Sequence, residues 1–224
     1  FSPQLIARSA PVLQYLTVSH LESRDIKHLL YDEDGHPLTY PRLENISIRV
    51  MAVDDPTARH KAAENVAPFP VLRRFVSEKG YAFADETPFK GNSDTLDYLR
   101  VDIGSDALDI LHKSEAFSNG RFSKLRRIVG HCLINERPPT CSDYRIKAAL
   151  SLTSPATQIL SLGFCSSYQQ IVSSILTRSF LKNIRILSLE NTSFTLSELL
   201  NLVKLFPCVT DLACLPGDID PHLN

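Results

Sequence analysis

Glycine is scarce in this sequence, which has only eight glycines among its 224 residues. Three glycine-dependent motifs are absent: G-x-G-x-x-G, the phosphate-binding loop and the G-x-S-x-G turn that presents a catalytic serine. Their absence removes the usual sequence signs of nucleotide binding and of serine hydrolases. We therefore expect a protein that is not an enzyme and that binds no cofactor.

Strong net charge and long apolar runs are also absent. The formal net charge is −1 at pH 7, which gives no bulk electrostatic attraction to nucleic acid or to an anionic membrane. No apolar run approaches the ~18 residues that a membrane-spanning helix needs. We expect neither a nucleic-acid partner nor a membrane partner.

A disulfide framework is not indicated either. The five cysteines are an odd number and include no C-x-x-C pair. Several of them lie in apolar sequence contexts, which is typical of buried thiols in a reducing compartment. We expect a cytoplasmic or nuclear protein. Because the sequence begins with Phe1 rather than methionine, we treat it as a piece of a longer chain.

The clearest local pattern in the sequence covers residues 184–212. Leu187 and Leu189 alternate as the buried side chains of a strand do. Thr195 and Glu198 have the spacing of a capping box, which predicts a helix start. The helix that follows has an apolar stripe at helical period: Leu196, Leu199, Leu200 and Val203. A single strand–helix unit cannot bury both apolar faces, so we expect further copies stacked beside it.

Eight copies of one apolar triplet, L-x-x-L-x-L in its ideal form, fill the sequence. Their first positions are on average 28 residues apart, within the range of leucine-rich repeats. We therefore predict one α/β leucine-rich-repeat solenoid over residues 1–224, with about eight short parallel strands. The triplets begin at Leu13, Leu43, Leu72, Leu96, Leu125, Thr157, Ile184 and Val209.

The segments between the strands are predicted to be helices or loops. Apolar spacing favours helices at 24–31, 106–117 and 168–181, whereas prolines favour loops at 54–68 and 135–142. Three triplets have a polar or small residue where an apolar one is expected, and we expect irregular repeats there. These residues are Ser77, Gly130 and Thr157.

Four segments are similar to repeats of a known group, the leucine-rich-repeat regions of fungal F-box-like proteins. The resemblance extends over nearly the whole sequence. It implies a horseshoe with a parallel sheet on its concave side, and a role as the substrate receptor of a cullin-type ubiquitin ligase. A Skp-type adaptor would bind only through a segment outside this sequence. The segments are YPRLENISI (40–48), FPVLRRF (69–75), SDTLDYLRV (93–101) and FPCVTDL (206–212).

Two alternatives to the ligase receptor are an interaction scaffold or adaptor without a ligase role and an enzyme built on a parallel β-solenoid. The enzyme would need carboxylates and bases clustered on adjacent strands, and the outward strand positions carry arginine, tyrosine and serine instead. We therefore favour protein recognition over catalysis.

Outward-facing strand residues form two predicted columns across the sheet. Adjacent strands lie about 4.8 Å apart, so arginines and tyrosines from the third to fifth repeats should gather in one patch. Arginine suits carboxylate or phosphate groups and tyrosine adds contact area, which favours a protein or peptide ligand that is acidic or phosphorylated. The candidate partner-binding residues are Tyr15, Arg74, Tyr98, Arg100 and Arg127.

An alternative interpretation of the patch is a solvent-exposed set of charges in which Glu78, Asp97 and Asp102 neutralise the arginines across strands.

Two weaker candidates are metal sites. His112 and Glu115 share a helix face but have no third ligand in register. The run 32–35 has the acidic start of a calcium loop but not its later ligands, so we expect an acidic turn and no metal.

Overall fold

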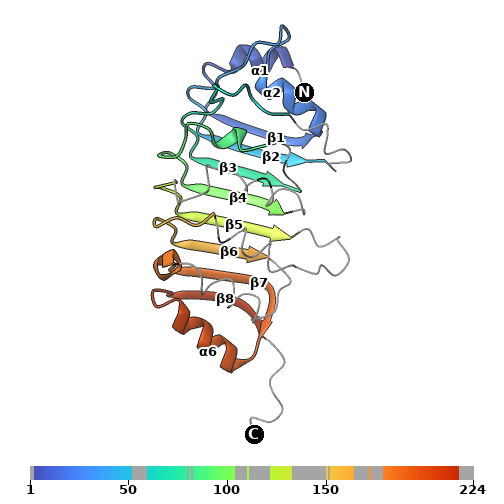
Figure 1. The fold of residues 1–224 in the computed structure, drawn as a ribbon. Coiled ribbons are helices and arrows are strands. Elements are labelled where there is room, and N and C mark those ends of the chain that lie inside the picture. The colour runs from blue at the N-terminus through green and yellow to red at the C-terminus, as the bar shows by residue number, and fades with distance from the viewer. Residues whose placement is uncertain are drawn as a thin grey trace.

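The computed structural model describes residues 3–51, 60–79, 81, 83–103, 110, 122–132, 150, 152–163, 172 and 179–216. It contains one sheet of eight strands, all parallel and in the order of the sequence (Figure 1). An α/β fold with a parallel sheet was predicted, and it is confirmed. The strands are β1 (Tyr15–Leu21), β2 (Asn45–Val50), β3 (Arg74–Glu78), β4 (Tyr98–Ile103), β5 (Arg127–Cys132), β6 (Ile159–Gly163), β7 (Ile186–Phe194) and β8 (Asp211–Pro216).

The described helices are short. The expected helix at 24–31 is present as a 3-10 turn followed by α2, whereas nearly all of 106–117 and 168–181, and all of 135–142, lie outside the described residues. None of the described helices has the length and apolar character needed to cross a membrane. The helices are α1 (Pro3–Ser9), η1 (Ser23–Ile26), α2 (Lys27–Leu30), η3 (Thr87–Phe89), η5 (Ser179–Asn183) and α6 (Leu196–Leu205).

The register of the sheet follows the repeat of the sequence. The middle apolar residue of each triplet pairs with the corresponding residue of the next strand, through all eight strands. Most of these side chains are buried. The paired residues are Leu16, Ile46, Phe75, Leu99, Ile128, Leu160, Leu187 and Leu212.

The irregularity expected at Ser77, Gly130 and Thr157 is not seen in the pairing of their strands, whereas most of the returns of the fifth and sixth repeats lie outside the described residues. Pairing is continuous through β3, β5 and β6, and the register shifts instead between β1 and β2 and between β7 and β8. Thr157 fits because its buried hydroxyl donates to the carbonyl of Leu125 at 2.9 Å and accepts from the amide of Ser154 at 2.9 Å. Two hydrogen bonds offset the cost of burying this polar group.

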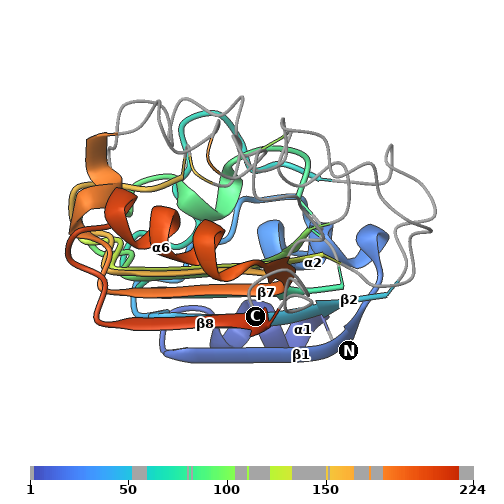
Figure 2. The ribbon, with the colours of Figure 1, turned by 90° about the horizontal axis from the view of Figure 1, so that it is seen from below.

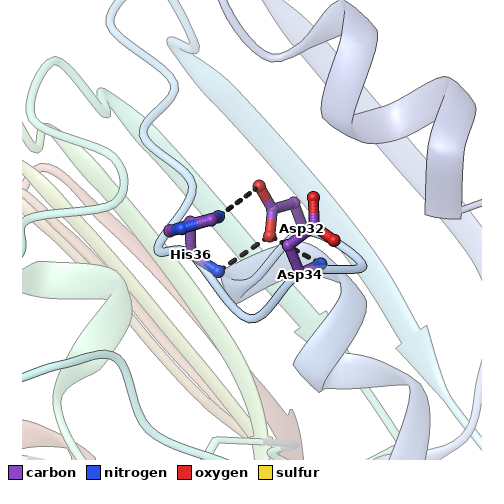
Figure 3. A group of neighbouring side chains, drawn as sticks. All are labelled: Asp32, Asp34 and His36. Atoms are coloured by element: carbon purple, nitrogen blue, oxygen red, sulfur yellow. Dashed lines mark hydrogen bonds and ion pairs between the residues drawn. The ribbon is translucent and has the colours of Figure 1, made fainter.

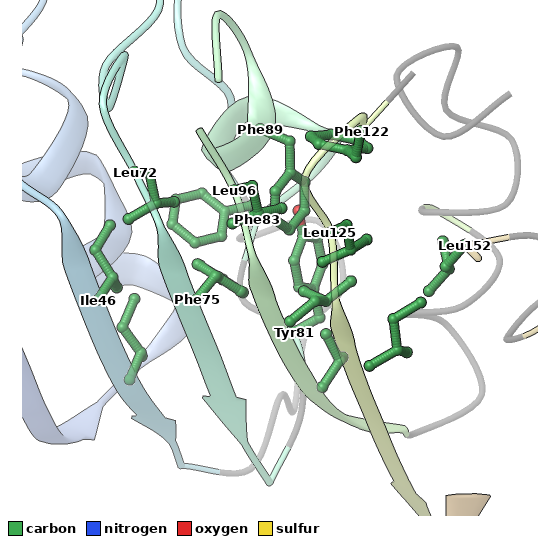
Figure 4. Close-up of a cluster of buried hydrophobic side chains, with 14 of the residues drawn as sticks. Ile46, Leu72, Phe75, Tyr81, Phe83, Phe89, Leu96, Phe122, Leu125 and Leu152 are labelled. Carbon is green, nitrogen blue, oxygen red and sulfur yellow. The ribbon is translucent and has the colours of Figure 1, made fainter. Parts of the chain in front are cut away.

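Five aromatic rings form the core behind β3, β4 and β5 (Figure 4). Phe75 projects from β3 into this group, and its ring centroid lies 5.1 Å from that of Phe89. The return between β3 and β4 supplies most of the other rings, and the hydroxyl of Tyr81 donates to the carbonyl of Asp85 at 2.7 Å. This aromatic cluster consists of Phe75, Tyr81, Phe83, Phe89 and Phe122.

The helix α6 begins at the predicted capping box. The hydroxyl of Thr195 accepts from the amide of Glu198, and the Glu198 carboxylate accepts from the amide of Thr195. The predicted buried stripe is wrong in part, because Leu202 is the fully buried residue of the helix and Leu199 is only half-buried. The other members of the predicted stripe are exposed: Leu196, Leu200 and Val203.

This difference predicts unequal effects of two similar substitutions in α6. Leu202→Ala is expected to lower the free energy of unfolding by about 2–5 kcal/mol, because it removes a buried side chain and leaves a cavity. Leu200→Ala should change it by less than about 0.5 kcal/mol, since Leu200 is 57% exposed. Urea unfolding of the two variants measures the difference. Equal losses would show that the exposed side of α6 contributes to the core.

Two glycines with positive φ give a second matched pair. Gly91 has φ +76° and an added Cβ would lie 2.8 Å from the Cβ of Ala67, whereas Gly35 has φ +82° and nothing within 4 Å. Gly35→Ala should therefore cost about 1–2 kcal/mol, the penalty of left-handed backbone alone. Gly91→Ala should cost more, because Ala67 must also move. Thermal unfolding of both variants tests this, and a Gly35 variant as unstable as the Gly91 variant would contradict it.

Candidate functional site

The candidate site lies on the open face of the sheet, defined as the face away from α2 and α6. Figure 2 shows these helices on one side of the sheet, which curves so that its opposite side is concave. The first column on the open face is Tyr15, Asn45, Arg74, Tyr98, Arg127, Ile159, Ile186 and Asp211. The second column is Thr17, Ser47, Val76, Arg100, Val129, Ser161, Ser188 and Ala213.

At the centre of the open face, two arginines enclose a tyrosine. The guanidinium carbon of Arg74 on β3 lies 4.2 Å from the centroid of the Tyr98 ring, and that of Arg127 on β5 lies 5.2 Å from it. Because Tyr98 is on the strand between them, the two cations approach the ring from its two neighbouring strands. Both contacts are within the range of cation–π interactions. We call these three residues the Arg–Tyr–Arg cluster.

The two arginines of the Arg–Tyr–Arg cluster are restrained by their contacts with the Tyr98 ring. Arg74 and Arg127 are exposed, and within the described part of the chain neither has a carboxylate at ion-pair distance. Stacking on the ring restricts the guanidinium planes, so less side-chain entropy is lost when a ligand binds. The cluster therefore offers two ordered forks of hydrogen-bond donors to an anionic group.

Arg100 occupies a different environment from the other two arginines. It lies in the second column, half-buried, and its Nη1 atom is 3.5 Å from Oε1 of Glu78 on β3. Its neighbours across the strands are Val76 and Val129, which are 4% and 6% exposed. Arg100 is thus partly neutralised inside the face, as the alternative interpretation expected of the whole patch.

Asp97, a second carboxylate of that interpretation, forms no ion pair with the Arg–Tyr–Arg cluster among the described contacts. Asp97 is exposed and directly precedes β4, beside Arg73 and Arg126, which directly precede β3 and β5; the three residues line a small cavity of about 200 Å³. Arg73 has its own partner there, since its Nε atom is 3.6 Å from Glu44. The side chain of Asp102 lies outside the described residues. Among the described side chains, cross-strand neutralisation is therefore seen for Arg100 and not for Arg74 or Arg127.

Tyr15 is separated from the other predicted residues. It is on β1, at one end of the sheet, and β2 lies between it and Arg74 on β3. Its side chain is 66% exposed. Two strand spacings of about 4.8 Å place it roughly 10 Å from the Arg–Tyr–Arg cluster. Tyr15 can contact only a ligand that also extends over β1.

Two isoleucines on the open face were not among the predicted site residues. Ile159 and Ile186 continue the first column on β6 and β7, directly after Arg127. Ile186 is 38% exposed and Ile159 is half-buried. The sequence places both residues in the first column, but nothing in it marked them as binding residues. They form an aliphatic pair on β6 and β7, between Arg127 on β5 and Asp211 on β8.

The acidic turn at 32–36 is explained by its own hydrogen bonds (Figure 3). Oδ1 of Asp32 accepts from the amides of Asp34 and His36 at 3.0 and 2.7 Å. The backbone hydrogen bond from His36 is the main cause that lowers the pKa of Asp32 below its ordinary value. Asp32, Asp34 and His36 lie close enough to share a cation, but the turn accounts for their arrangement. The predicted pair His112 and Glu115 lies outside the described residues.

The sequence matches no family model and no curated protein. The function of the open face is therefore inferred from its geometry.

Proposed function

We propose that this chain is a leucine-rich-repeat solenoid whose open face recognises another protein. The repeat length, the sequential order of eight parallel strands and the continuous register support the solenoid assignment. In such arrays a curved sheet presents an extended surface, built from one or two side chains of each repeat. The exposed side chains in the two columns would form the contact surface.

The observation that carries the proposal is the Arg–Tyr–Arg cluster. Two exposed guanidinium groups stack on one ring, with no carboxylate at ion-pair distance among the described residues. Arginine and tyrosine, together with tryptophan, are enriched among the residues that contribute most to binding at protein interfaces. Their charge favours an acidic or phosphorylated segment of the partner.

We further propose that recognition serves ubiquitin ligation in the cytoplasm or nucleus, with this chain as the substrate-binding part of an F-box-like receptor. The support is the resemblance of its repeats to those of fungal F-box-like proteins. A Skp-type adaptor would be held by a segment outside residues 1–224. The second candidate is an interaction scaffold with the same open face and no ligase.

Affinity capture of the full-length protein, followed by mass spectrometry, tests the proposal. Recovery of a Skp-type adaptor and a cullin with the bait is expected for the ligase receptor. Their reproducible absence, with other proteins recovered, would replace it by the scaffold. A capture that recovers the same proteins with Arg74→Glu/Arg127→Glu bait as with unaltered bait would contradict recognition through the open face.

A further inference from the structure

The open face changes its chemistry between β5 and β6. On one side of this boundary lies the Arg–Tyr–Arg cluster, which ends at Arg127. On the other side Ile159 and Ile186 follow in the same column. The second column supplies only serines beside them, Ser161 and Ser188, and serine is too short to cover an isoleucine. A ligand that follows the first column therefore meets two cations and then two isoleucines, and the exposed Asp211 follows them on β8.

Resting on the proposed function, we infer that the ligand is an extended peptide with two anchors four residues apart: an anionic side chain and an aliphatic one. The anionic side chain, a carboxylate or a phosphate, binds between Arg74 and Arg127. The aliphatic side chain packs on Ile159 and Ile186. The positive charge of the cluster favours this peptide over a neutral one, and the solvent-accessible isoleucines favour it over a peptide with acidic residues alone.

The spacing of the two anchors follows from the sheet. From Tyr98 on β4 to the midpoint of β6 and β7 is two and a half strand spacings, about 12 Å. An extended peptide covers about 13 Å in four residues, and side chains four apart in it point the same way. A helical ligand would need eight residues for about 12 Å. The strand spacing thus distinguishes an extended ligand from a helical one by the sequence separation of its anchors.

Synthetic peptides of one neutral host sequence, labelled with fluorescein, test the inference by anisotropy with the 224-residue protein. Each peptide carries glutamate or phosphoserine at its centre, and a leucine two, four or eight residues away on either side. Further peptides carry the anionic residue alone or leucine alone. A peptide with leucine four residues away should bind at least about tenfold more tightly than the anion-only peptide. Partial burial of one leucine side chain provides enough free energy for this increase in affinity. Comparison of glutamate with phosphoserine identifies the anion.

Variants of the protein locate the aliphatic anchor. Ile159→Ser/Ile186→Ser should remove the advantage that leucine gives. The matched control is Leu200→Ser, because Leu200 is exposed on α6, away from the open face, and it should keep that advantage.

Each other outcome overturns a defined part of the argument. If leucine gives no advantage while anionic peptides bind, the aliphatic anchor is wrong and acidic recognition stands. If leucine eight residues away binds best, the ligand is helical and the extended arrangement is wrong. If leucine alone binds as well as the two-anchor peptide, or no peptide binds, both this inference and acidic recognition by the open face fail.

Discussion

Phe75→Ala is expected to lower the free energy of unfolding by about 3–5 kcal/mol, the range for removing a buried ring. The Phe75 side chain is fully buried, and its centroid lies 5.1 Å from Phe89, 6.2 Å from Phe83 and 6.3 Å from Tyr81. Alanine would leave a cavity between three rings and the sheet, and rigid rings close such a space only in part. The loss of ring–ring contacts adds to the loss of buried area.

The matched control for Phe75→Ala is Tyr15→Ala. Both residues are aromatic and lie on strands of the same sheet, but Tyr15 points to the open face and is 66% exposed. Its removal should change the free energy of unfolding by no more than about 0.5 kcal/mol. In a chain of this size each kcal/mol lowers the melting temperature by about 2–4 °C, so calorimetry should separate the variants by roughly 10 °C. Similar melting temperatures would mean that the aromatic cluster is not part of the stable core.

The strands were predictable because one pattern recurs eight times. Side chains alternate along a strand, so a fixed apolar spacing determines both the face and the register of each copy. The sequence alone therefore assigns residues as far apart as Tyr15 and Asp211 to one column, and the strand pairing agrees. Single departures such as Ser77 did not disturb this register, because seven other copies specify it.

The features that were missed depend on contacts that no local pattern encodes. Tyr81, Phe83 and Phe89 lie in a return with neither helical nor strand periodicity, and only packing against Phe75 reveals them as core. In α6 the leucines occur on more than one side, and the position of the neighbouring chain decides that Leu202 is the buried one. Stacking in the Arg–Tyr–Arg cluster depends on side-chain rotamers, whereas the sequence specified only which strands are adjacent.

Replacing both Arg74 and Arg127 by glutamate should weaken binding of the captured partner at least about 100-fold. Truncating one partner of a charge pair that is buried and hydrogen-bonded in an interface costs about 2–5 kcal/mol, and each 1.4 kcal/mol is tenfold in affinity. The two glutamates would also repel an acidic ligand across the ring of Tyr98. Biolayer interferometry with the purified partner measures the affinity, and binding by the unaltered protein should weaken as salt is raised.

Stability and charge controls show whether such a loss is specific to the Arg–Tyr–Arg cluster. Arg8→Glu/Lys204→Glu makes the same change in net charge on exposed positions of α1 and α6, and its affinity should stay close to that of the unaltered protein. The cluster variant loses two exposed cation–π contacts, worth about 0.5–1 kcal/mol each, so it should remain folded. Equal weakening by both variants would show that net charge governs binding. Undiminished binding by the cluster variant would show that Arg74 and Arg127 are ordinary surface charges.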